Sequence, residues 1–160
     1  MALDFTTPRE AEVLVTGLGD TVSFYKIGLE LAYGGGLPFA QDLIRDAKQV
    51  FLDLKLHDIV ATVSRACTRV AGLGARFLTV HAYSQTMRAA KLATAGSSLR
   101  LLGVTVLTSC DDMDLADAGY AFGVQDLVPP RRASLRSRHR RLDPIGPGKH
   151  VPYARAWDAK

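Results

Sequence analysis

The sequence predicts an α/β fold with a parallel sheet of the (β/α)8 barrel type, in which about five βα units can be recognised. Over residues 1–128, short β-branched or apolar runs alternate with amphipathic stretches, and right-handed crossovers make the strands of such serial units parallel. An open doubly wound sheet begins in the same way, so the polar residues are needed to distinguish it from a barrel. Each strand run ends in a polar or ionisable side chain: Asp4, Lys26, Asp53 with Lys55, His81 and Thr108. In a barrel these carboxyl ends converge on one mouth, where barrel enzymes hold their active sites, so the pattern favours the barrel.

The expected strands are short runs rich in apolar and β-branched residues, at 2–4, 22–27, 50–56, 77–80 and 101–107. Each is followed by a stretch with apolar residues at helical spacing, and the expected helices cover 8–18, 37–47, 61–73, 84–95 and 111–118. Ala11 and Leu14 begin such a stripe in the first helix, and the last helix has the weakest pattern. The glycine run at 34–36 is interpreted as a turn before the second helix, and Gly74 ends the third.

The composition indicates a soluble globular protein. The chain has 160 residues, of which 48% are apolar and 22% charged, and these values exclude disorder, collagen and a disulfide scaffold for the chain as a whole. No apolar run approaches the ~18 residues that span a bilayer, and the first residues lack the pattern of a signal peptide. Cys67 and Cys110 are too few for a disulfide framework. We therefore expect a cytoplasmic protein without a membrane partner.

Charge and proline content divide the chain at Val128. The net charge is +4, but residues 129–160 hold nine Lys/Arg and two Asp, whereas residues 1–128 hold eleven Lys/Arg and fourteen Asp/Glu. Five of the seven prolines also follow Val128. We therefore expect a partial barrel over 1–128 and a basic, Pro/Arg-rich tail without a strand over 129–160, with solvated disorder as the main interpretation. An RNA-binding arm is the alternative, but aromatic residues do not interleave the arginine cluster, so no nucleic-acid partner is expected.

The most informative segment is Phe-Leu-Asp-Leu-Lys-Leu-His-Asp at 51–58. Strand side chains alternate, so its three leucines share one face, and Asp53 and Lys55 lie together on the other. Both faces of a buried parallel strand are normally apolar, and Asp58 adds a second carboxylate at the end of this strand. A structural ion pair is the alternative, but desolvation makes such a pair a poor stabiliser. We expect Lys55, between two carboxylates, to serve as a fixed cation and proton donor in one group.

With these residues the sequence resembles the orotidine 5′-phosphate decarboxylase family. The resemblance runs through five blocks in the same order within 1–128: Ala2-Leu3-Asp4, Phe24 to Gly28, Phe51 to Ile59, Val80-His81-Ala82 and Val104 to Ser109. The Asp-x-Lys-x-x-Asp motif at 53–58 alone marks the superfamily, and the flanking blocks indicate the family. The resemblance implies a (β/α)8 barrel that works as a dimer and decarboxylates orotidine 5′-phosphate without a metal or organic cofactor.

The resemblance implies catalytic roles for Lys55, Asp53, Lys26 and Asp58. Lys55 would stabilise the carbanion at carbon 6 of the pyrimidine and then protonate it. Asp53 would face the substrate carboxylate and orient Lys55. Lys26 and Asp4 would bind ribose hydroxyls and complete the charged network, although Asp4 could instead cap the helix that follows it.

The resemblance also implies a homodimer with twofold symmetry. Asp58, with Ile59 and Thr62, would reach across the interface into the partner's site. Thr108 would lie by the amide edge of the pyrimidine, although it could equally be a turn residue. The substrate expected at this shared site is a small nucleotide.

The resemblance stops at Val128. Intact family members continue with three more strands that carry a phosphate-gripping loop, usually with Thr-Pro-Gly-Ile-Arg, and a final Gly-Arg pair, and neither motif occurs here. Residues 129–160 instead turn to Arg and Pro, as an out-of-frame reading of a GC-rich gene would. We therefore expect a frameshifted or otherwise altered carboxyl-terminal part, and we give no phosphate-binding role to Arg131 or Arg132.

Two other functions remain open. Magnesium-dependent sugar-phosphate decarboxylases and aldolases of the same superfamily share the motif but stabilise an enediolate with the metal. They carry a carboxylate at the end of the second strand, where this chain has Lys26, so a metal-free reaction is favoured and no metal site is expected. The second alternative is an inactive fragment that acts only as a binding module, which would fit the missing phosphate motifs.

Overall fold

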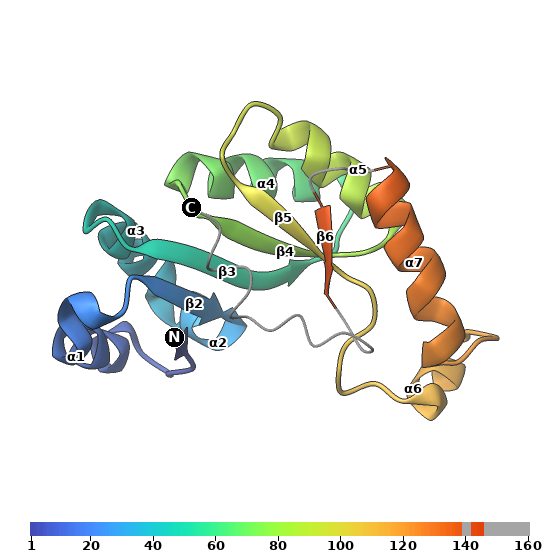
Figure 1. Cartoon of the computed structure of the whole chain (residues 1–160), viewed down its shortest axis with the longest axis horizontal. Coiled ribbons are helices and arrows are strands. Elements are labelled where there is room, and N and C mark those ends of the chain that lie inside the picture. The colour runs from blue at the N-terminus through green and yellow to red at the C-terminus, as the bar shows by residue number, and fades with distance from the viewer. Residues whose placement is uncertain (139–141, 146–160) are drawn as a thin grey trace.

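The computed structural model describes residues 1–138 and 142–145, which form a parallel sheet with helices packed around it (Figure 1). The six strands lie in the sheet in chain order, and every neighbouring pair is parallel. They are β1 (Ala2–Leu3), β2 (Phe24–Gly28), β3 (Gln49–Leu56), β4 (Phe77–His81), β5 (Arg100–Val104) and β6 (Leu142–Ile145). This strand order is that of a barrel wall, because each connection adds the next strand at the same edge.

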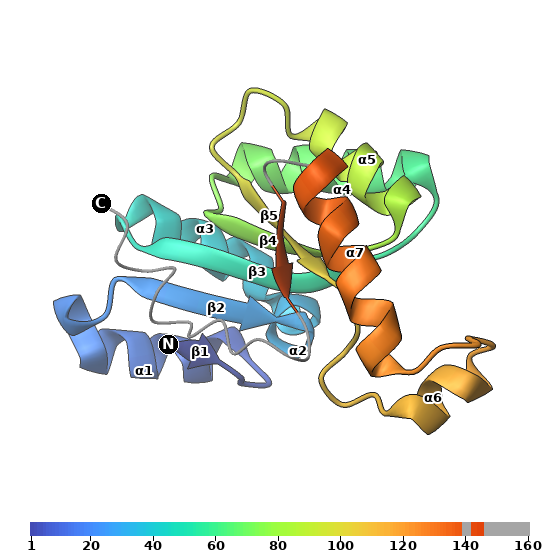
Figure 2. The same cartoon turned by 45° about the vertical axis from the view of Figure 1, so that its right-hand side comes forward.

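Helical segments connect the strands. The α-helices are α1 (Pro8–Leu18), α2 (Leu29–Leu31), α3 (Leu37–Arg45), α4 (Val60–Leu73), α5 (Ser84–Ala93), α6 (Asp112–Asp117) and α7 (Val124–Arg138). A 3₁₀ turn, η1 (Gly19–Thr21), follows α1, and a π-helical turn, η2 (Ala32–Gly36), joins α2 to α3. In Figure 2, α4 and α5 lie side by side on one face of the sheet, and α7 lies beside β6. Among residues 1–138 and 142–145, no helix is long and apolar enough to cross a membrane.

The sheet separates two apolar layers. The larger layer joins the strands to the helices and includes Tyr25, Ile27, Leu52, Val63, Cys67, Leu78, Val80 and Met87. The smaller layer lies on the opposite, inner face, where Phe24, Phe51 and Phe77 pack together with Leu102. Because strand side chains alternate, the residues two positions after each phenylalanine point to this inner face as well. The phenylalanine layer therefore forms an apolar floor below the carboxyl ends of β2, β3 and β4.

The five expected βα units are all present, with bounds that shift by a few residues. Helix α1 begins at Pro8, as predicted, because Thr7 and Glu10 form a capping box. The Glu10 backbone N–H donates to the Thr7 hydroxyl, and the Thr7 backbone N–H donates to the Glu10 carboxylate. Asp4 is therefore not the cap of this helix. Helix α4 ends before Gly74, also as predicted, and the φ of 85° at Gly74 lies in the left-handed region that favours glycine.

The glycine run at 34–36 contains a kink between two helical segments, at the position where the sequence predicts a turn. Helical segments lie on both sides of this kink, and Gly35 has a φ of 96° and a ψ of 13°, which are not helical values. Close packing explains the other two glycines. A Cβ at Gly34 would collide with the carbonyl oxygen of Thr6, and a Cβ at Gly36 would collide with Leu31. The run therefore lets this segment pack against the loop before α1, which a local sequence pattern does not reveal.

The carboxyl-terminal part also differs from the expected tail. Helix α7 runs through the predicted boundary at Val128, a buried residue of a small apolar cluster. Strand β6 then pairs with β5 in parallel register, with Pro144 opposite Gly103. The sequence predicts no strand here because the run is short and contains a proline. The structure tolerates Pro144 because β6 lies at the edge of the described sheet. The rest of the expected tail, at 139–141 and 146–160, lies outside the described residues.

Candidate active site

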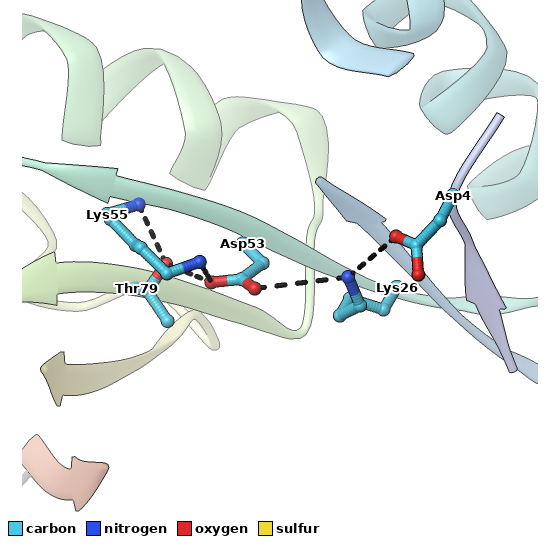
Figure 3. A network of polar contacts seen from close by, with 5 residues as sticks. All are labelled: Asp4, Lys26, Asp53, Lys55 and Thr79. Atoms are coloured by element: carbon cyan, nitrogen blue, oxygen red, sulfur yellow. Dashed lines mark hydrogen bonds and ion pairs between the residues drawn. The ribbon is translucent and has the colours of Figure 1, made fainter. Parts of the chain in front are cut away.

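Four charged side chains of alternating sign form a network at the carboxyl ends of β1, β2 and β3 (Figure 3). The Lys26 ammonium lies 3.0 Å from Asp4 Oδ1 and 4.0 Å from Asp53 Oδ2. The Lys55 ammonium lies 2.9 Å from Asp53 Oδ1. We call Asp4, Lys26, Asp53 and Lys55 the charged tetrad. The tetrad joins the ends of three successive strands, as the barrel prediction requires.

Most of the tetrad is partly withdrawn from solvent. The side chain of Asp53 is 14% exposed, that of Lys26 21% and that of Lys55 34%. The strand pattern explains this placement, because Lys26 and Asp53 each lie two residues beyond a phenylalanine of the apolar floor. Water screens charges above an apolar floor less than it screens fully exposed charges, so these ion pairs attract more strongly than surface pairs.

Strand β3 departs from regular pairing at the tetrad. Its pairing with β4 is interrupted after Leu52 and resumes at Leu56, so that three residues of β3 lie opposite the single residue Thr79. Within this bulge Lys55 has a φ of 47°, in the left-handed region that side-chain-bearing residues rarely adopt. The predicted division of faces is still present, because the leucines of β3 pack in the helix-side core while the two charges contact each other.

Thr79 is a site residue that the sequence analysis missed. Its side chain is buried, and its hydroxyl accepts a hydrogen bond from the backbone N–H of Lys55 at 2.9 Å. The same hydroxyl donates to Asp53 Oδ1 at 2.9 Å. The available signal was a hydroxyl residue in the middle of the otherwise apolar strand run at 77–80. The bulge and the tetrad are therefore connected to β4 through one side chain.

The structure places Asp58, Ile59 and Thr62 at the start of α4, where none of them pairs with the tetrad within the described residues. Asp58 is exposed, and its Oδ1 accepts the backbone N–H of Ile59 at 2.6 Å. Ile59 is 70% exposed, and Thr62 is half-buried in the first turn of the helix. Thr108 is exposed in the segment after β5. Lys55 is therefore paired with one carboxylate in this part of the chain, rather than held between two as the sequence predicts.

A second cluster of polar and aromatic side chains lies at the ends of β3 and β4. His57 stacks on Tyr83 with ring centroids 4.3 Å apart, and its Nδ1 lies 2.9 Å from Thr86 Oγ1. The Arg131 guanidinium of α7 lies 4.7 Å from the centroid of the Tyr83 ring and donates to the Tyr120 hydroxyl at 3.0 Å. Arg131 is thus engaged by aromatic side chains of its own chain.

His81, at the end of β4, faces this cluster. Its ring centroid lies 5.7 Å from that of His57. Burial lowers the pKa of His81 below the ordinary value of 6.5, and the positive charges of His57, Arg131 and Lys55 lower it further. A histidine of this kind is a neutral imidazole at physiological pH, with one nitrogen free to donate and one free to accept a hydrogen bond.

The tetrad carboxylates are neutralised by the protein's own lysines. Asp4 and Asp53 both contact Lys26, and Asp53 also contacts Lys55. Over the described ranges, no group of three or more His, Cys, Asp or Glu side chains is placed to hold a metal ion. The described site therefore presents positive and negative side chains in alternation to a ligand.

A parallel barrel-type sheet with a charged network at the carboxyl ends of its strands defines an α/β-barrel protein with its site at the mouth. Comparison with known proteins narrows this class. The family model of the Orotidine 5′-phosphate decarboxylase / HUMPS family matches residues 1–134. The chain belongs to this family, as the sequence motifs predict.

Curated relatives from several bacteria carry the name orotidine 5′-phosphate decarboxylase. The relative from Bradyrhizobium sp. (strain BTAi1) is 61% identical over 136 residues, which cover 85% of this chain and 56% of the relative. The relative from Rhodopseudomonas palustris (strain TIE-1) is 60% identical over 131 residues, which cover 82% of this chain and 55% of the relative. The chain therefore spans about half the length of the curated relatives it matches.

Solved structures show the same likeness. Orotidine 5′-phosphate decarboxylase from Lactobacillus acidophilus superposes with a TM-score of 0.74 at 34% identity, over 82% of this chain and 63% of that one. The decarboxylase from Pyrococcus horikoshii OT3 gives a TM-score of 0.66 over 92% of this chain and 65% of that one, and at 20% identity it shows the fold alone. These matches confirm the α/β barrel-type fold that the sequence predicts.

Proposed function

We propose that this chain decarboxylates orotidine 5′-phosphate to uridine 5′-phosphate, a step of pyrimidine nucleotide synthesis. The observation that carries the proposal is the charged tetrad, in which two ammonium groups alternate with two carboxylates at the mouth of the sheet. The family and the names of the curated relatives support this substrate. We also propose a cytoplasmic location, because Cys67 and Cys110 are both free thiols.

The proposed reaction needs a cation where negative charge develops. Cleavage of the bond between carbon 6 and the carboxylate carbon releases CO₂ and leaves the electron pair on carbon 6. In our scheme the Lys55 ammonium stabilises this carbanion and then donates a proton to it, and solvent returns a proton to the lysine. One group thus supplies both the counter-charge and the proton, so the scheme needs neither a metal ion nor an organic cofactor.

The rest of the tetrad orients this lysine and the substrate. Asp53 holds the Lys55 ammonium at 2.9 Å and is proposed to face the substrate carboxylate. Lys26 and Asp4, 3.0 Å apart, are proposed to bind ribose hydroxyls. Because these contacts exist before substrate binds, the charges need little reorganisation during the reaction, which is the main source of electrostatic catalysis.

We also propose a twofold homodimer in which Asp58 and Thr62 reach into the partner's site. The Asp58 carboxylate is exposed, and the two residues after it, Ile59 and Val60, are 70% and 42% exposed. Exposed apolar side chains next to an exposed acid suit a protein interface better than open solvent. Thr108, which is also exposed, is proposed to contact the pyrimidine amide edge. Sedimentation tests the dimer: we expect a dimeric parent and a monomeric Ile59→Asp variant.

The tetrad favours this reaction over the magnesium-dependent one. A divalent cation bound by Asp4 and Asp53 would have to displace the Lys26 ammonium that contacts both. Mg²⁺ prefers carboxylate oxygens, phosphates and water, and a nearby ammonium competes with it electrostatically. The metal-free decarboxylation is therefore the function that the geometry supports best.

Turnover of orotidine 5′-phosphate by the purified 160-residue protein tests the proposal. We expect CO₂ release that EDTA does not abolish. Activity that EDTA abolishes and Mg²⁺ restores would instead assign the chain to the magnesium-dependent branch. A protein that neither turns over this substrate nor binds uridine 5′-phosphate in a calorimetric titration would contradict the proposal and leave the sugar-phosphate enzyme and the binding module as alternatives.

A further inference from the structure

The bulge that carries Lys55 is tied to β4 by one buried hydroxyl, that of Thr79. We propose that Thr79 is a positioning residue, which holds the Lys55 backbone and the Asp53 carboxylate in the arrangement that the reaction uses. The inference rests on the proposed function and deepens it, because Thr79 acts on the two groups nearest the reacting carbon without itself touching the substrate.

The chemistry of the three groups fixes the direction of both hydrogen bonds. The backbone N–H of Lys55 can only donate, so the Thr79 oxygen accepts at 2.9 Å. The Thr79 hydroxyl proton is then free to be donated to Asp53 Oδ1, also at 2.9 Å, and an ionised carboxylate can only accept. Thr79 thus connects the backbone of the catalytic lysine to the carboxylate that orients the same lysine.

The carboxylate contact determines where the Lys55 ammonium lies. Asp53 Oδ1 receives both the Thr79 hydroxyl and the Lys55 ammonium, each at 2.9 Å, while Oδ2 faces Lys26 at 4.0 Å. Without the hydroxyl the carboxylate would keep its two lysine partners but lose the contact that sets its rotation. Small displacements of a reacting group are costly, since a shift of about 1 Å can slow a reaction on the order of a hundredfold.

The backbone contact stabilises a strained residue. Lys55 has a φ of 47°, and such conformations persist only where the surrounding structure enforces them. Thr79 is 1% exposed, so water does not readily replace its hydroxyl as the acceptor for the Lys55 N–H. Thr79→Val, which is nearly isosteric, would leave that N–H without its partner, whereas Thr79→Ser would retain the oxygen.

The test compares Thr79→Val and Thr79→Ser with a matched control, Thr94→Val. Thr94 is also a buried threonine, but its hydroxyl donates to the Ala90 carbonyl in α5 and does not contact the tetrad. In Thr79→Val we expect the Lys55 amide to exchange with solvent at least about tenfold faster, because its acceptor is lost. We expect kcat to fall by about tenfold to a hundredfold with little change in KM. Thr79→Ser should restore both values towards the parent, and Thr94→Val should change neither.

Several results would overturn the inference. They are an unchanged kcat in Thr79→Val, a serine variant as impaired as the valine variant, or an equal loss in Thr94→Val. A parent protein that neither reacts with orotidine 5′-phosphate nor binds uridine 5′-phosphate would contradict the proposed function instead. In that case the exchange rate of the Lys55 amide decides whether Thr79 holds the bulge, and a rate equal to the parent's in Thr79→Val overturns the inference.

Discussion

Lys55 combines an ammonium group that the proposed chemistry needs with a backbone conformation that costs stability. Its φ of 47° lies within a bulge of β3, and strain of this kind is worth on the order of 1–3 kcal/mol. The same bulge directs the N–H of Lys55 to Thr79 and its ammonium to Asp53. The strain is therefore located at the residue whose two polar groups form the site.

Two substitutions of Lys55 separate its chemical role from its conformational one. Lys55→Ala and Lys55→Gly both remove the ammonium, so we expect decarboxylation to fall by at least about a hundredfold to a thousandfold in each. We expect the glycine variant to be more stable than the alanine variant by about 1 kcal/mol, because glycine adopts a positive φ without strain. Steady-state turnover and urea denaturation check both. Turnover within about tenfold of the parent would contradict the catalytic role, and a more stable alanine variant would contradict the strain.

His81 should make the stability of the protein depend on pH. Its pKa is lowered below 6.5, mainly by burial, so the folded protein binds this proton less readily than the unfolded chain. The stabilising contribution is therefore complete above the unfolded value of 6.5 and is lost as the pH falls towards the folded pKa. We expect His81→Gln to reduce this loss, measured as the free energy of unfolding in urea at about pH 7.5 and about pH 5.5. Equal losses in parent and variant would show that His81 is not its source.

At the scale of elements, local patterns predicted the five expected βα units and missed the packing between distant segments. Apolar runs and helical stripes place strands and helices to within a few residues, because each element buries one face against the larger core. Strand β6 has no such signal, since its four residues include a proline and it depends on pairing with β5. The close packing at Gly34 likewise depends on the approach of Thr6, far from it along the chain.

The glycine run gives a matched pair of substitutions. A Cβ at Gly34 would collide with the Thr6 carbonyl oxygen, so we expect Gly34→Ala to destabilise the protein by about 1–3 kcal/mol through overpacking. Gly17, in α1, has no atom within 4 Å of its added Cβ, so Gly17→Ala should be neutral or stabilising by up to about 1 kcal/mol. Urea denaturation, which gives the free energy of unfolding of each variant, tests this difference. A Gly34→Ala variant as stable as Gly17→Ala would mean that the loop before α1 can move away from the added methyl group without a loss of stability.

For the whole molecule, parallel topology made the tetrad predictable, while the bulge in β3 made the contacts of Thr79 unpredictable. Polar residues at successive strand ends meet at one edge of a parallel sheet, so four separate positions in the sequence indicate one site. The proposed role of Thr79 depends on where β3 shifts register against β4, which no local pattern records. The proposed contribution of Asp58 to a partner's site would lie outside the contacts of a single chain.

The carboxyl-terminal part of the chain bears on how the phosphate of the substrate is bound. Residues 129–160 lack the Thr-Pro-Gly-Ile-Arg and Gly-Arg motifs that the resemblance to the family implies for phosphate binding, and within the described residues the sheet is open, with β1 and β6 at its edges. Binding energy from a remote group helps to order the site around the transition state, so its loss should lower kcat as well as affinity. We therefore expect a chimera of residues 1–128 with the carboxyl-terminal part of the Bradyrhizobium relative to turn over orotidine 5′-phosphate at least about a hundredfold faster than the 160-residue chain. Equal rates would show that the residues after Val128, or a partner chain, already supply the phosphate site, and would contradict an altered carboxyl-terminal part.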